Sequence, residues 1–288
     1  MILLPHSLSK TTKDILNQHN IKLNKNLGQN YLIDENKRNQ IIGFGNICEN
    51  DVVLEIGSGI GTLTLEIAER AKKVIAIEKD TVISNILKKR LDDEGIDNVC
   101  IINGDALKVD FPFFNKIISN LPYQISSPVT FKLLDYDFES GVLMYQKEFA
   151  KRMTAKVNTR DYSRLTAMLY FKCDVEIVTS VSPESFIPNP KVDSAVVLLK
   201  PKEKSLSDCE FKIYSKFTKA LFQHKNKKIK NALIDSRHII SDIDKKILKE
   251  RLNNIKDPEV SHYFSKRITE LHPSEILKLS GKLNPIFE

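Results

Sequence analysis

The chain has 288 residues, of which 41% are hydrophobic and 28% charged, as expected for a globular protein with one large core and a smaller domain. No apolar run approaches the length of a membrane span, and the first residues form too short an apolar stretch for a signal peptide. The net charge of +7 lies mostly in residues 205–288, which carry 17 basic and 11 acidic side chains, and this imbalance indicates a polyanionic partner.

The four cysteines, Cys48, Cys100, Cys173 and Cys209, are scattered and form no C-x-x-C pair. We expect reduced thiols in a cytoplasmic protein, with neither zinc ligands nor disulfides. The N-terminal residues 1–25 are polar, with a weak amphipathic pattern. The following loop offers a bend at Gly28 and amide groups at Gln29 and Asn30, and Asp34 predicts the N-cap of a helix that ends near Ile42.

The glycine-rich stretch over residues 51–61 is the strongest motif. Its first half is β-branched and aliphatic, which predicts a buried parallel strand, and Gly57, Gly59 and Gly61 then follow at alternate positions. Apolar residues at helical spacing continue to Ala71. Strand, glycine turn and helix form the opening unit of a nucleotide-binding α/β sheet, although the glycines could also serve only to join two elements.

Two further predicted strands end next to acidic side chains. The strand over residues 73–77 ends at Glu78, where a carboxylate could accept from ribose hydroxyls, and the strand over residues 99–103 precedes Asp105, which could accept from an adenine amino group. Ligands bind at the carboxyl ends of parallel strands, so these acids are expected at one pocket with the glycines. The glycine spacing differs from the dinucleotide fingerprint, and the set favours S-adenosylmethionine over a nicotinamide cofactor.

A fourth strand over residues 116–119 leads to Asn120-Leu121-Pro122-Tyr123 on the same edge. Pro122 favours an extended Leu121, so the Asn120 side-chain oxygen and a nearby backbone carbonyl can be held in fixed directions. Two acceptors that hold both N–H groups of adenine N6 would turn its lone pair toward a methyl donor, and Tyr123 offers a face for the base. The alternative is an Asn-Pro turn with a core tyrosine.

The rest of the first domain continues the alternation of strands and helices. We expect a helix from Ser126, a strand over residues 142–145 and a helix over residues 147–155. Strands are then predicted over residues 165–171, 176–180 and 194–200. In the proline-stiffened segment 185–194, Phe186 could close the opposite side of a base stacked on Tyr123, or lie in the core.

The remaining residues predict a basic, helical C-terminal domain. We place the boundary at residues 201–205, giving domains 1–204 and 205–288. Helices are expected from Ser207, with a capping box, to His224, from Ser241 or Asp244 to Asn253, and from Pro273 to a point before Gly281. Four lysines follow the first of these helices and are expected either to contact RNA phosphates or to form a solvated surface: Lys225, Lys227, Lys228 and Lys230.

Several motifs in one order resemble the KsgA-type ribosomal RNA adenine dimethyltransferase family, with the archaeal members most similar. They are Leu27–Leu32, Glu55–Thr64, Glu78, Gly104-Asp105, Asn120–Tyr123, Gln146-Lys147-Glu148 and Phe186–Ser194, with a looser likeness from Leu221 to Leu233. The chain departs from the family pattern at Ser58, where proline is frequent, and at His224–Lys228, which replaces an arginine-rich sequence of bacterial members. Lysine lacks the planar fork of arginine, so RNA contacts there are expected to differ in geometry from those of bacterial members.

The resemblance implies a Rossmann-like class I methyltransferase sheet with helices on both faces and a small helical domain. It implies dimethylation of N6 of two adjacent adenosines in the terminal hairpin loop of small-subunit rRNA, within a pre-ribosomal particle, by a monomer with S-adenosylmethionine as methyl donor. Asn120, Leu121, Pro122, Tyr123 and Phe186 are then expected to act on the base. The donor site is expected to comprise Gln29, Asn30, Leu32, Gly57, Gly59, Glu78, Asp105 and Asn120.

Three other functions compete with this one. A large-subunit rRNA methyltransferase would share the chemistry, but the segment 186–194 argues against it. An RNA-binding assembly or transcription factor could retain the fold without turnover, although the intact residues 120–123 argue against pure binding. A DNA adenine methyltransferase usually has a second proline in place of Leu121 and is ranked lower.

Overall fold

A computed structural model describes residues 7–21, 29–203 and 206–288, which form two compact units. The first unit comprises Met1–Ala150 and Val175–Pro201, and the second comprises Lys151–Asp174 and Lys202–Glu288. The boundary expected after residue 204 is therefore wrong for residues 151–174, which belong with the C-terminal helices.

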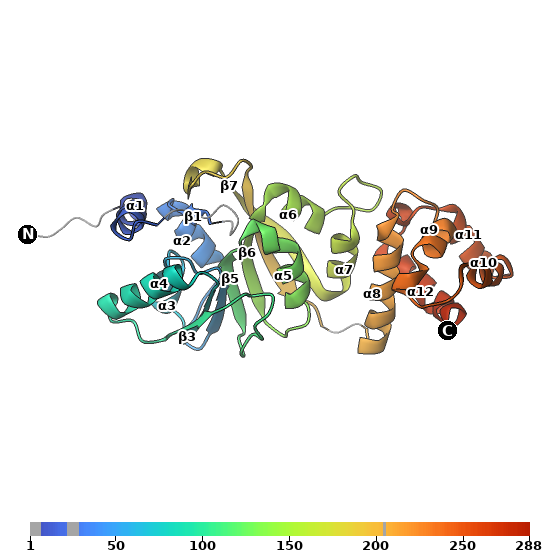
Figure 1. Ribbon diagram of the computed structural model, residues 1–288, viewed down its shortest axis with the longest axis horizontal. Coiled ribbons are helices and arrows are strands. Elements are labelled where there is room, and N and C mark those ends of the chain that lie inside the picture. Colours follow the sequence, from blue (N-terminus) through green and yellow to red (C-terminus); the bar gives the residue numbers. More distant parts are fainter. Residues whose placement is uncertain (1–6, 22–28, 204–205) are drawn as a thin grey trace, which may run out of the picture. The chain divides into compact units, whose positions relative to one another are not determined.

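The first unit is built on a seven-stranded sheet in the order β4-β3-β2-β5-β6-β9-β7 (Figure 1). Strands β2 to β6 pair in parallel, and β9 pairs antiparallel with β6. The strands are β2 (Val52–Ile56), β3 (Lys73–Glu78), β4 (Val99–Asn103), β5 (Lys116–Asn120), β6 (Ser140–Gln146), β7 (Cys173–Val181) and β9 (Ser194–Pro201). The parallel strands direct their carboxyl ends to one edge of the sheet, as the sequence predicted.

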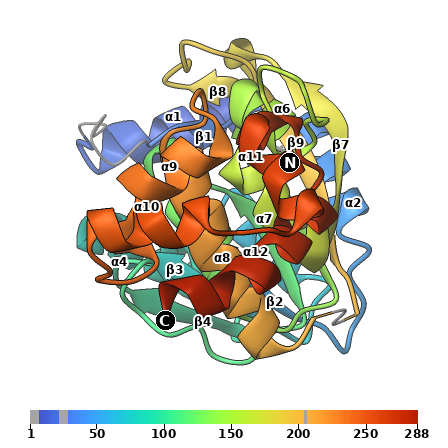
Figure 2. The same ribbon diagram turned by 90° about the vertical axis from the view of Figure 1, so that its right-hand side faces the viewer.

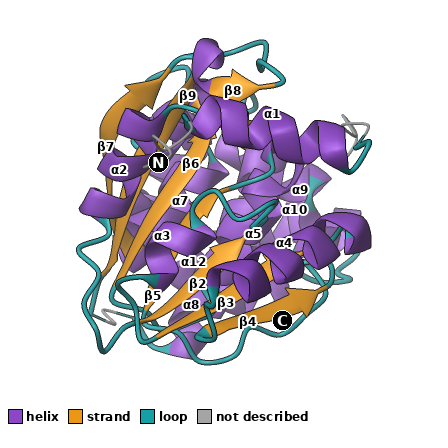
Figure 3. Ribbon diagram, turned by 90° about the vertical axis from the view of Figure 1, so that its left-hand side faces the viewer, coloured by secondary structure: helices purple, strands orange, loops and turns teal. Residues whose placement is uncertain are grey.

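Helices cover both faces of this sheet, as Figure 3 shows. Apolar side chains of α2 and α3 pack in one core cluster with Val53, Val74 and Ile118, and α4 packs on Ala76 of the same face. On the opposite face Thr130 of α5 hydrogen-bonds to Tyr145 of β6. The helices of this unit are α1 (Leu8–Gln18), α2 (Glu35–Phe44), α3 (Thr64–Ala68), α4 (Thr81–Glu94), α5 (Ser126–Leu133) and α6 (Lys147–Met153), the last of which runs into the second unit.

Local sequence signals explain the ends of several elements. Asp34 caps α2 by accepting from the Lys37 N–H at 3.1 Å, as predicted, and Asp80 caps α4 in the same way. A separate two-stranded sheet pairs β1 (Tyr31–Leu32) antiparallel with β8 (Phe186–Ile187). This pairing brings the N-terminal loop and the segment 186–194 together beside the main sheet.

The second unit is helical, and its helices face the viewer in Figure 2. Its first helix occupies residues expected to form a strand: the apolar run over residues 165–169 is buried, and such a run does not distinguish a strand from a buried helix. A capping box between Ser163 and Thr166 starts the helix there. The helices are α7 (Arg164–Lys172), α8 (Asp208–Gln223), α9 (Ile229–Asp235), α10 (Lys245–Asn253), α11 (Pro258–Ser265) and α12 (Pro273–Phe287).

Most of the predicted C-terminal helices are confirmed. Ser207 and Glu210 form the expected capping box of α8, and Asp244 caps α10. The last helix was predicted to end before Gly281, but α12 continues through it and buries Leu283 and Phe287, because the apolar face offsets the low helix propensity of one glycine. Among the described residues, no helix combines the length and apolarity needed to cross a membrane.

Candidate functional site

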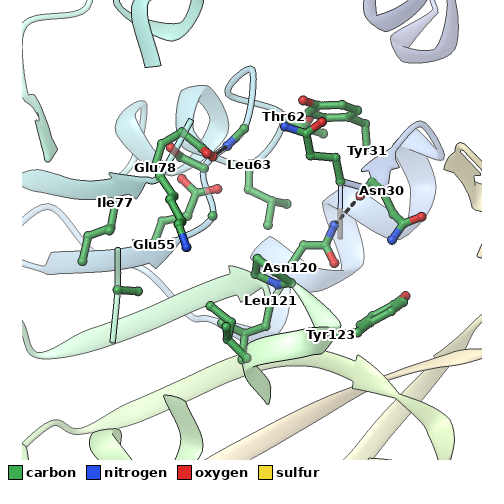
Figure 4. A pocket seen from close by; sticks show the side chains of 18 of the residues that line it. Asn30, Tyr31, Glu55, Thr62, Leu63, Ile77, Glu78, Asn120, Leu121 and Tyr123 are labelled. Atoms are coloured by element: carbon green, nitrogen blue, oxygen red, sulfur yellow. Dashed lines mark hydrogen bonds between the residues drawn. The ribbon is translucent and has the colours of Figure 1, made fainter. Parts of the chain in front are cut away.

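A pocket lies in the first unit at the carboxyl ends of β2, β3, β4 and β5 (Figure 4). It encloses about 1070 Å³ of space, part of it open to solvent, which is enough for a nucleoside-sized ligand. Its wall comprises the glycine turn, the ends of β3 and β5, the turn after β4 and the loop into β1. The lining residues are Gln29–Leu32, Glu55, Gly57–Gly59, Thr62, Leu63, Ile77–Lys79, Gly104–Ala106 and Asn120–Ile125.

The glycine turn leaves no room for side chains on one wall of this pocket. Gly57 has φ 76° and Gly59 has φ 56°, a region that other residues rarely adopt. A Cβ at Gly57 would lie 3.0 Å from the Pro122 ring, and one at Gly59 would lie 3.0 Å from the Tyr31 ring. The two glycines therefore permit both the turn and the close packing of its neighbours.

Glu78 is fixed by backbone donors on both carboxylate oxygens. One oxygen accepts from the Gly59 N–H and the other from the Asp80 N–H, each at 2.9 Å. Burial raises the pKa of Glu78, while these two hydrogen bonds oppose the rise. Each oxygen keeps a further lone pair, so the carboxylate can accept from a vicinal diol placed in the pocket.

Asp105 lies in the turn after β4 and lines the same pocket. Its carboxylate accepts from the Leu107 N–H at 3.0 Å and forms an ion pair with Lys79 at 3.0 Å. The Leu107 hydrogen bond and then the Lys79 contact lower the pKa of Asp105, so it is an anionic acceptor at neutral pH.

Glu55 is a second, deeply buried carboxyl group beneath the glycine turn. It is 2% exposed and accepts from the Thr64 hydroxyl at 2.6 Å. Burial raises its pKa to about 8, with a smaller contribution from the negative charge of Glu78. The Glu55 carboxyl group is therefore mostly protonated at neutral pH.

Asn120 is oriented by one specific contact. Its side-chain N–H₂ donates to the backbone carbonyl of Asn30 at 3.0 Å, drawn as a dashed line in Figure 4. That bond directs the opposite end of the amide, the oxygen, as an acceptor. Leu121 is buried, and Pro122 directly after it has φ −58° and ψ 123°, an extended conformation.

Tyr123 is half-buried at the same edge, on the far side of Asn120 from Glu78 (Figure 4). Its hydroxyl hydrogen-bonds to the Ser194 hydroxyl over 2.5 Å, and Ser194 is fully buried at the start of β9. Burial raises the pKa of Tyr123, so the phenol stays neutral. The ring is thus held at its far end by a neighbouring strand.

The structure brings most of the predicted site residues together. The eight residues expected at the donor site all line the pocket, as do Leu121, Pro122 and Tyr123. Leu27 and Gly28, which the resemblance also included, lie outside the described residues. Sequence reasoning missed apolar wall residues such as Ile77, Ala106 and Ile125, although their places next to Glu78, Asp105 and Tyr123 could have indicated them.

Phe186 does not lie at the pocket, and its expected stacking on a base is not supported. Its side chain is 0% exposed and packs in the core cluster with Leu32, Ile41 and Ile42. The reason is the pairing of β8 with β1, in which Phe186 lies opposite Leu32 and shares its core-facing side. Phe186 instead supports the segment that carries Asn30 and Leu32.

The four lysines of the second unit have different surroundings. Lys227 pairs with Asp235 at 2.6 Å, and Lys230 donates to the Asn253 side chain at 2.7 Å. Lys228 is the exposed N-cap residue of α9, and Lys225 lines a separate hollow of the second unit. The four lysines therefore do not share one environment, and two of them are engaged by neighbouring side chains.

The sheet order and the glycine, acidic and Asn-Leu-Pro-Tyr positions define a methyltransferase of the Rossmann-like class. The pattern described as "Ribosomal RNA adenine dimethylase" matches residues 20–268. The chain belongs to the ribosomal RNA adenine dimethylase family, whose methyl donor is S-adenosylmethionine.

Sequence and structural relatives agree with this assignment. Two relatives are named "Probable ribosomal RNA small subunit methyltransferase A": one from Methanosphaera stadtmanae is 52% identical over 93% of this chain and 96% of its own, and one from Methanothermobacter thermautotrophicus is 49% identical over 96% of each. A crystal structure of a dimethyladenosine transferase from Plasmodium falciparum covers 88% of this chain and 98% of its own, with 34% identity and a TM-score of 0.74. A crystal structure of the 23S rRNA methyltransferase ErmE covers 88% of this chain and 99% of its own, with 26% identity and a TM-score of 0.63.

Proposed function

We propose that this protein dimethylates N6 of two adjacent adenosines in the 3′-terminal hairpin loop of small-subunit rRNA, with S-adenosylmethionine as donor. The observation that carries the proposal is the orientation of Asn120 by the Asn30 carbonyl, at the edge of a pocket that also holds Glu78 and Asp105. The small-subunit substrate is supported by the names of relatives that match nearly the whole chain.

The pocket fits S-adenosylmethionine through its donors and acceptors. Glu78 is assigned to the ribose hydroxyls, because both its oxygens are fixed beside the glycine turn and retain lone pairs. Asp105 is assigned to the adenine amino group of the donor, and Gln29, Asn30 and Leu32 to the wall formed by the loop into β1. The bound donor supplies an electrophilic methyl group on a sulfonium.

The target base is activated by orientation. The adenine N6 lone pair is delocalised into the ring and is a poor nucleophile. The Asn120 side-chain oxygen and a backbone carbonyl of residues 120–123 accept from the two N–H groups, which turns the lone pair toward the methyl group. Tyr123 supports the base by stacking. N6 gains the methyl group as S-adenosylhomocysteine leaves, and it loses one proton to solvent. The product amine therefore keeps one N–H, which one of the two acceptors can hold for the second transfer.

The biological setting completes the proposal. Two adjacent adenosines in a hairpin loop are reached by unstacking, which is cheaper in a loop than in a duplex. We place the reaction on a pre-ribosomal small subunit in the cytoplasm, with the enzyme acting as a monomer. The same chain could also serve as an assembly checkpoint by occupying the subunit until methylation is complete.

Methyl transfer to purified unmethylated small subunits tests the proposal directly. Subunits are incubated with the protein and labelled S-adenosylmethionine, and the rRNA is digested for nucleoside analysis. We expect N6,N6-dimethyladenosine at two adjacent positions, and far less of it in the same time with Asn120→Ala. Label in large-subunit rRNA instead would favour an ErmE-like activity, and binding without label would favour an RNA-binding assembly factor.

A further inference from the structure

A second hollow lies within the second unit, formed by the end of α6, the segment leading to α7 and the end of α8. It encloses about 820 Å³ of space, part of it open to solvent. Four of its side chains are cationic and one is acidic. The lining residues are Arg152, Arg160, Asp161, Tyr162, Ser163, Arg164, Phe222 and Lys225.

The hollow has a fixed frame. Tyr162 is buried at its base, donates to the Leu271 carbonyl at 2.9 Å and meets the Phe222 ring edge-on at 5.7 Å between centroids. Thr166 donates to the Arg152 carbonyl at 2.5 Å, which joins the end of α6 to the start of α7. The cationic residues therefore project from backbone that several contacts hold in place.

Two cations of the hollow have no carboxylate partner in the described part of the chain. Arg160 and Lys225 are exposed, and neither forms an ion pair with a carboxylate in the described part of the chain. Burial lowers the pKa of the half-buried Arg164, so its charged form has lost part of its hydration. Asp161 is the one acidic side chain among the lining residues.

Arginine and lysine together select the chemical class of the ligand. The planar guanidinium fork matches the geometry of phosphate oxygens, and an ammonium adds a point charge. Arg152, Arg160 and Lys225 are exposed, so a long polyanion can reach them from solvent. By contrast, Lys227 and Lys230 are already engaged by Asp235 and Asn253, so Lys225 is the member of the lysine run that shares a hollow with arginines.

We propose that this hollow binds a backbone phosphate of the rRNA substrate, at a site separate from the methyl-donor pocket. The inference rests on the proposed rRNA substrate. It assigns the phosphate contact to Arg160, Arg164 and Lys225, in place of the four-lysine run. The insertion of residues 151–174 into the second unit then has a functional consequence, because it brings arginines from one part of the chain to Lys225 from another.

The test compares two double variants that remove the same charge from the second unit. Arg160→Gln/Lys225→Gln alters the hollow, and Lys227→Gln/Lys230→Gln is the matched control. Binding to unmethylated small subunits is measured across a salt series for both variants and the parent, after thermal unfolding confirms that all are folded. We expect the hollow variant to reduce the salt slope of log K by about 0.7–0.9, the value for one lost phosphate contact, and the control to leave it unchanged.

Two further measurements separate the possible failures. Equal slopes for the hollow variant and the parent overturn the inference. If calorimetry shows that the parent binds inorganic pyrophosphate and the hollow variant does not, while the subunit slopes are equal, the hollow takes a small anion and the inference is also wrong. Failure of the parent to methylate subunits that it binds overturns the proposed function instead, whereas the slopes still decide the inference.

Discussion

Asn120 shows how much of a site can depend on one amide. Its N–H₂ group is held by the Asn30 carbonyl, so the oxygen has a defined direction before any substrate binds. We expect Asn120→Ala to fold and to bind S-adenosylmethionine, but to lose about 10²–10³ in the single-turnover rate, as for removal of one preorganised group. Rapid-quench assays on small subunits measure this loss, and a parent-like rate would remove Asn120 from the mechanism.

Glu78 combines a structural role with the proposed role of ribose acceptor. Because it accepts from Gly59 and Asp80, Glu78→Ala should both release the glycine turn and remove the ribose acceptor. Loss of charge-assisted hydrogen bonds costs roughly 1.5–3 kcal/mol, which corresponds to donor binding weaker by one to two orders of magnitude. Calorimetry with S-adenosylhomocysteine measures the change. RNA binding serves as the control and should be retained; equal donor affinity would contradict the assignment.

The Tyr123 hydroxyl has a partner that the sequence did not reveal. Stacking needs only the ring, so Tyr123→Ala should lose most activity, but Tyr123→Phe also loses the bond to Ser194. We expect Phe to reduce kcat several-fold, in line with a hydrogen bond worth about 0.5–1.5 kcal/mol. Ser194→Ala removes the same bond from its other end. If the effects of Tyr123→Phe and Ser194→Ala on kcat add fully in the double variant, the hydrogen bond between the two hydroxyls does not position the ring.

At the scale of elements, Glu55 at the end of β2 makes the free energy of unfolding depend on pH. Glu55 has a pKa near 8 in the folded chain and near 4.5 when unfolded. Between these values the folded state holds a proton that the unfolded state has released, so rising pH destabilises the fold by up to about 1.4 kcal/mol per pH unit. The stabilising contribution is complete below pH 4.5 and is lost by pH 8.

Glu55→Gln keeps the shape of the side chain and cannot ionise. We expect the variant to flatten the pH dependence of the free energy of unfolding across this range, and to be more stable than the parent at the alkaline end. Urea unfolding at several pH values gives the comparison. A parent curve without a decline toward pH 8 would show that Glu55 is ionised in the folded state throughout.

The elements also show which parts of the structure a sequence can predict. The pocket proposed for the methyl donor was predictable because glycines and acids directly follow β-branched runs, and parallel strands bring such ends together. The place of the Phe186 side chain was not predictable. An aromatic residue in a proline-rich segment has the same sequence signal whether it packs in the core or faces a ligand. For the same reason the apolar run of α7 resembled a strand: only its partners decide its form.

For the whole molecule, the division into units depends on contacts that are distant in sequence. Residues 151–174 join the second unit because Tyr214 of α8 is fully buried and donates to the Ala167 carbonyl at 2.8 Å, and because Tyr162 donates to Leu271. Neither contact could be predicted from local patterns. Composition indicated the boundary near residue 204, where the charge changes, and could not show that an earlier helix crosses to the other unit.

This grouping predicts how the chain loses structure. Tyr214→Phe removes a buried hydrogen bond and leaves the Ala167 carbonyl without that donor, which should cost about 1–3 kcal/mol. Native-state hydrogen exchange should then show α7 and α8 losing protection together, while the strands of the sheet and the affinity for S-adenosylmethionine stay unchanged. Tyr145→Phe is the matched control in the first unit, where the hydroxyl bonds to Thr130, and it should loosen α5 and β6 instead. If α7 follows the sheet strands in protection after Tyr214→Phe, residues 151–174 belong energetically to the methyltransferase sheet.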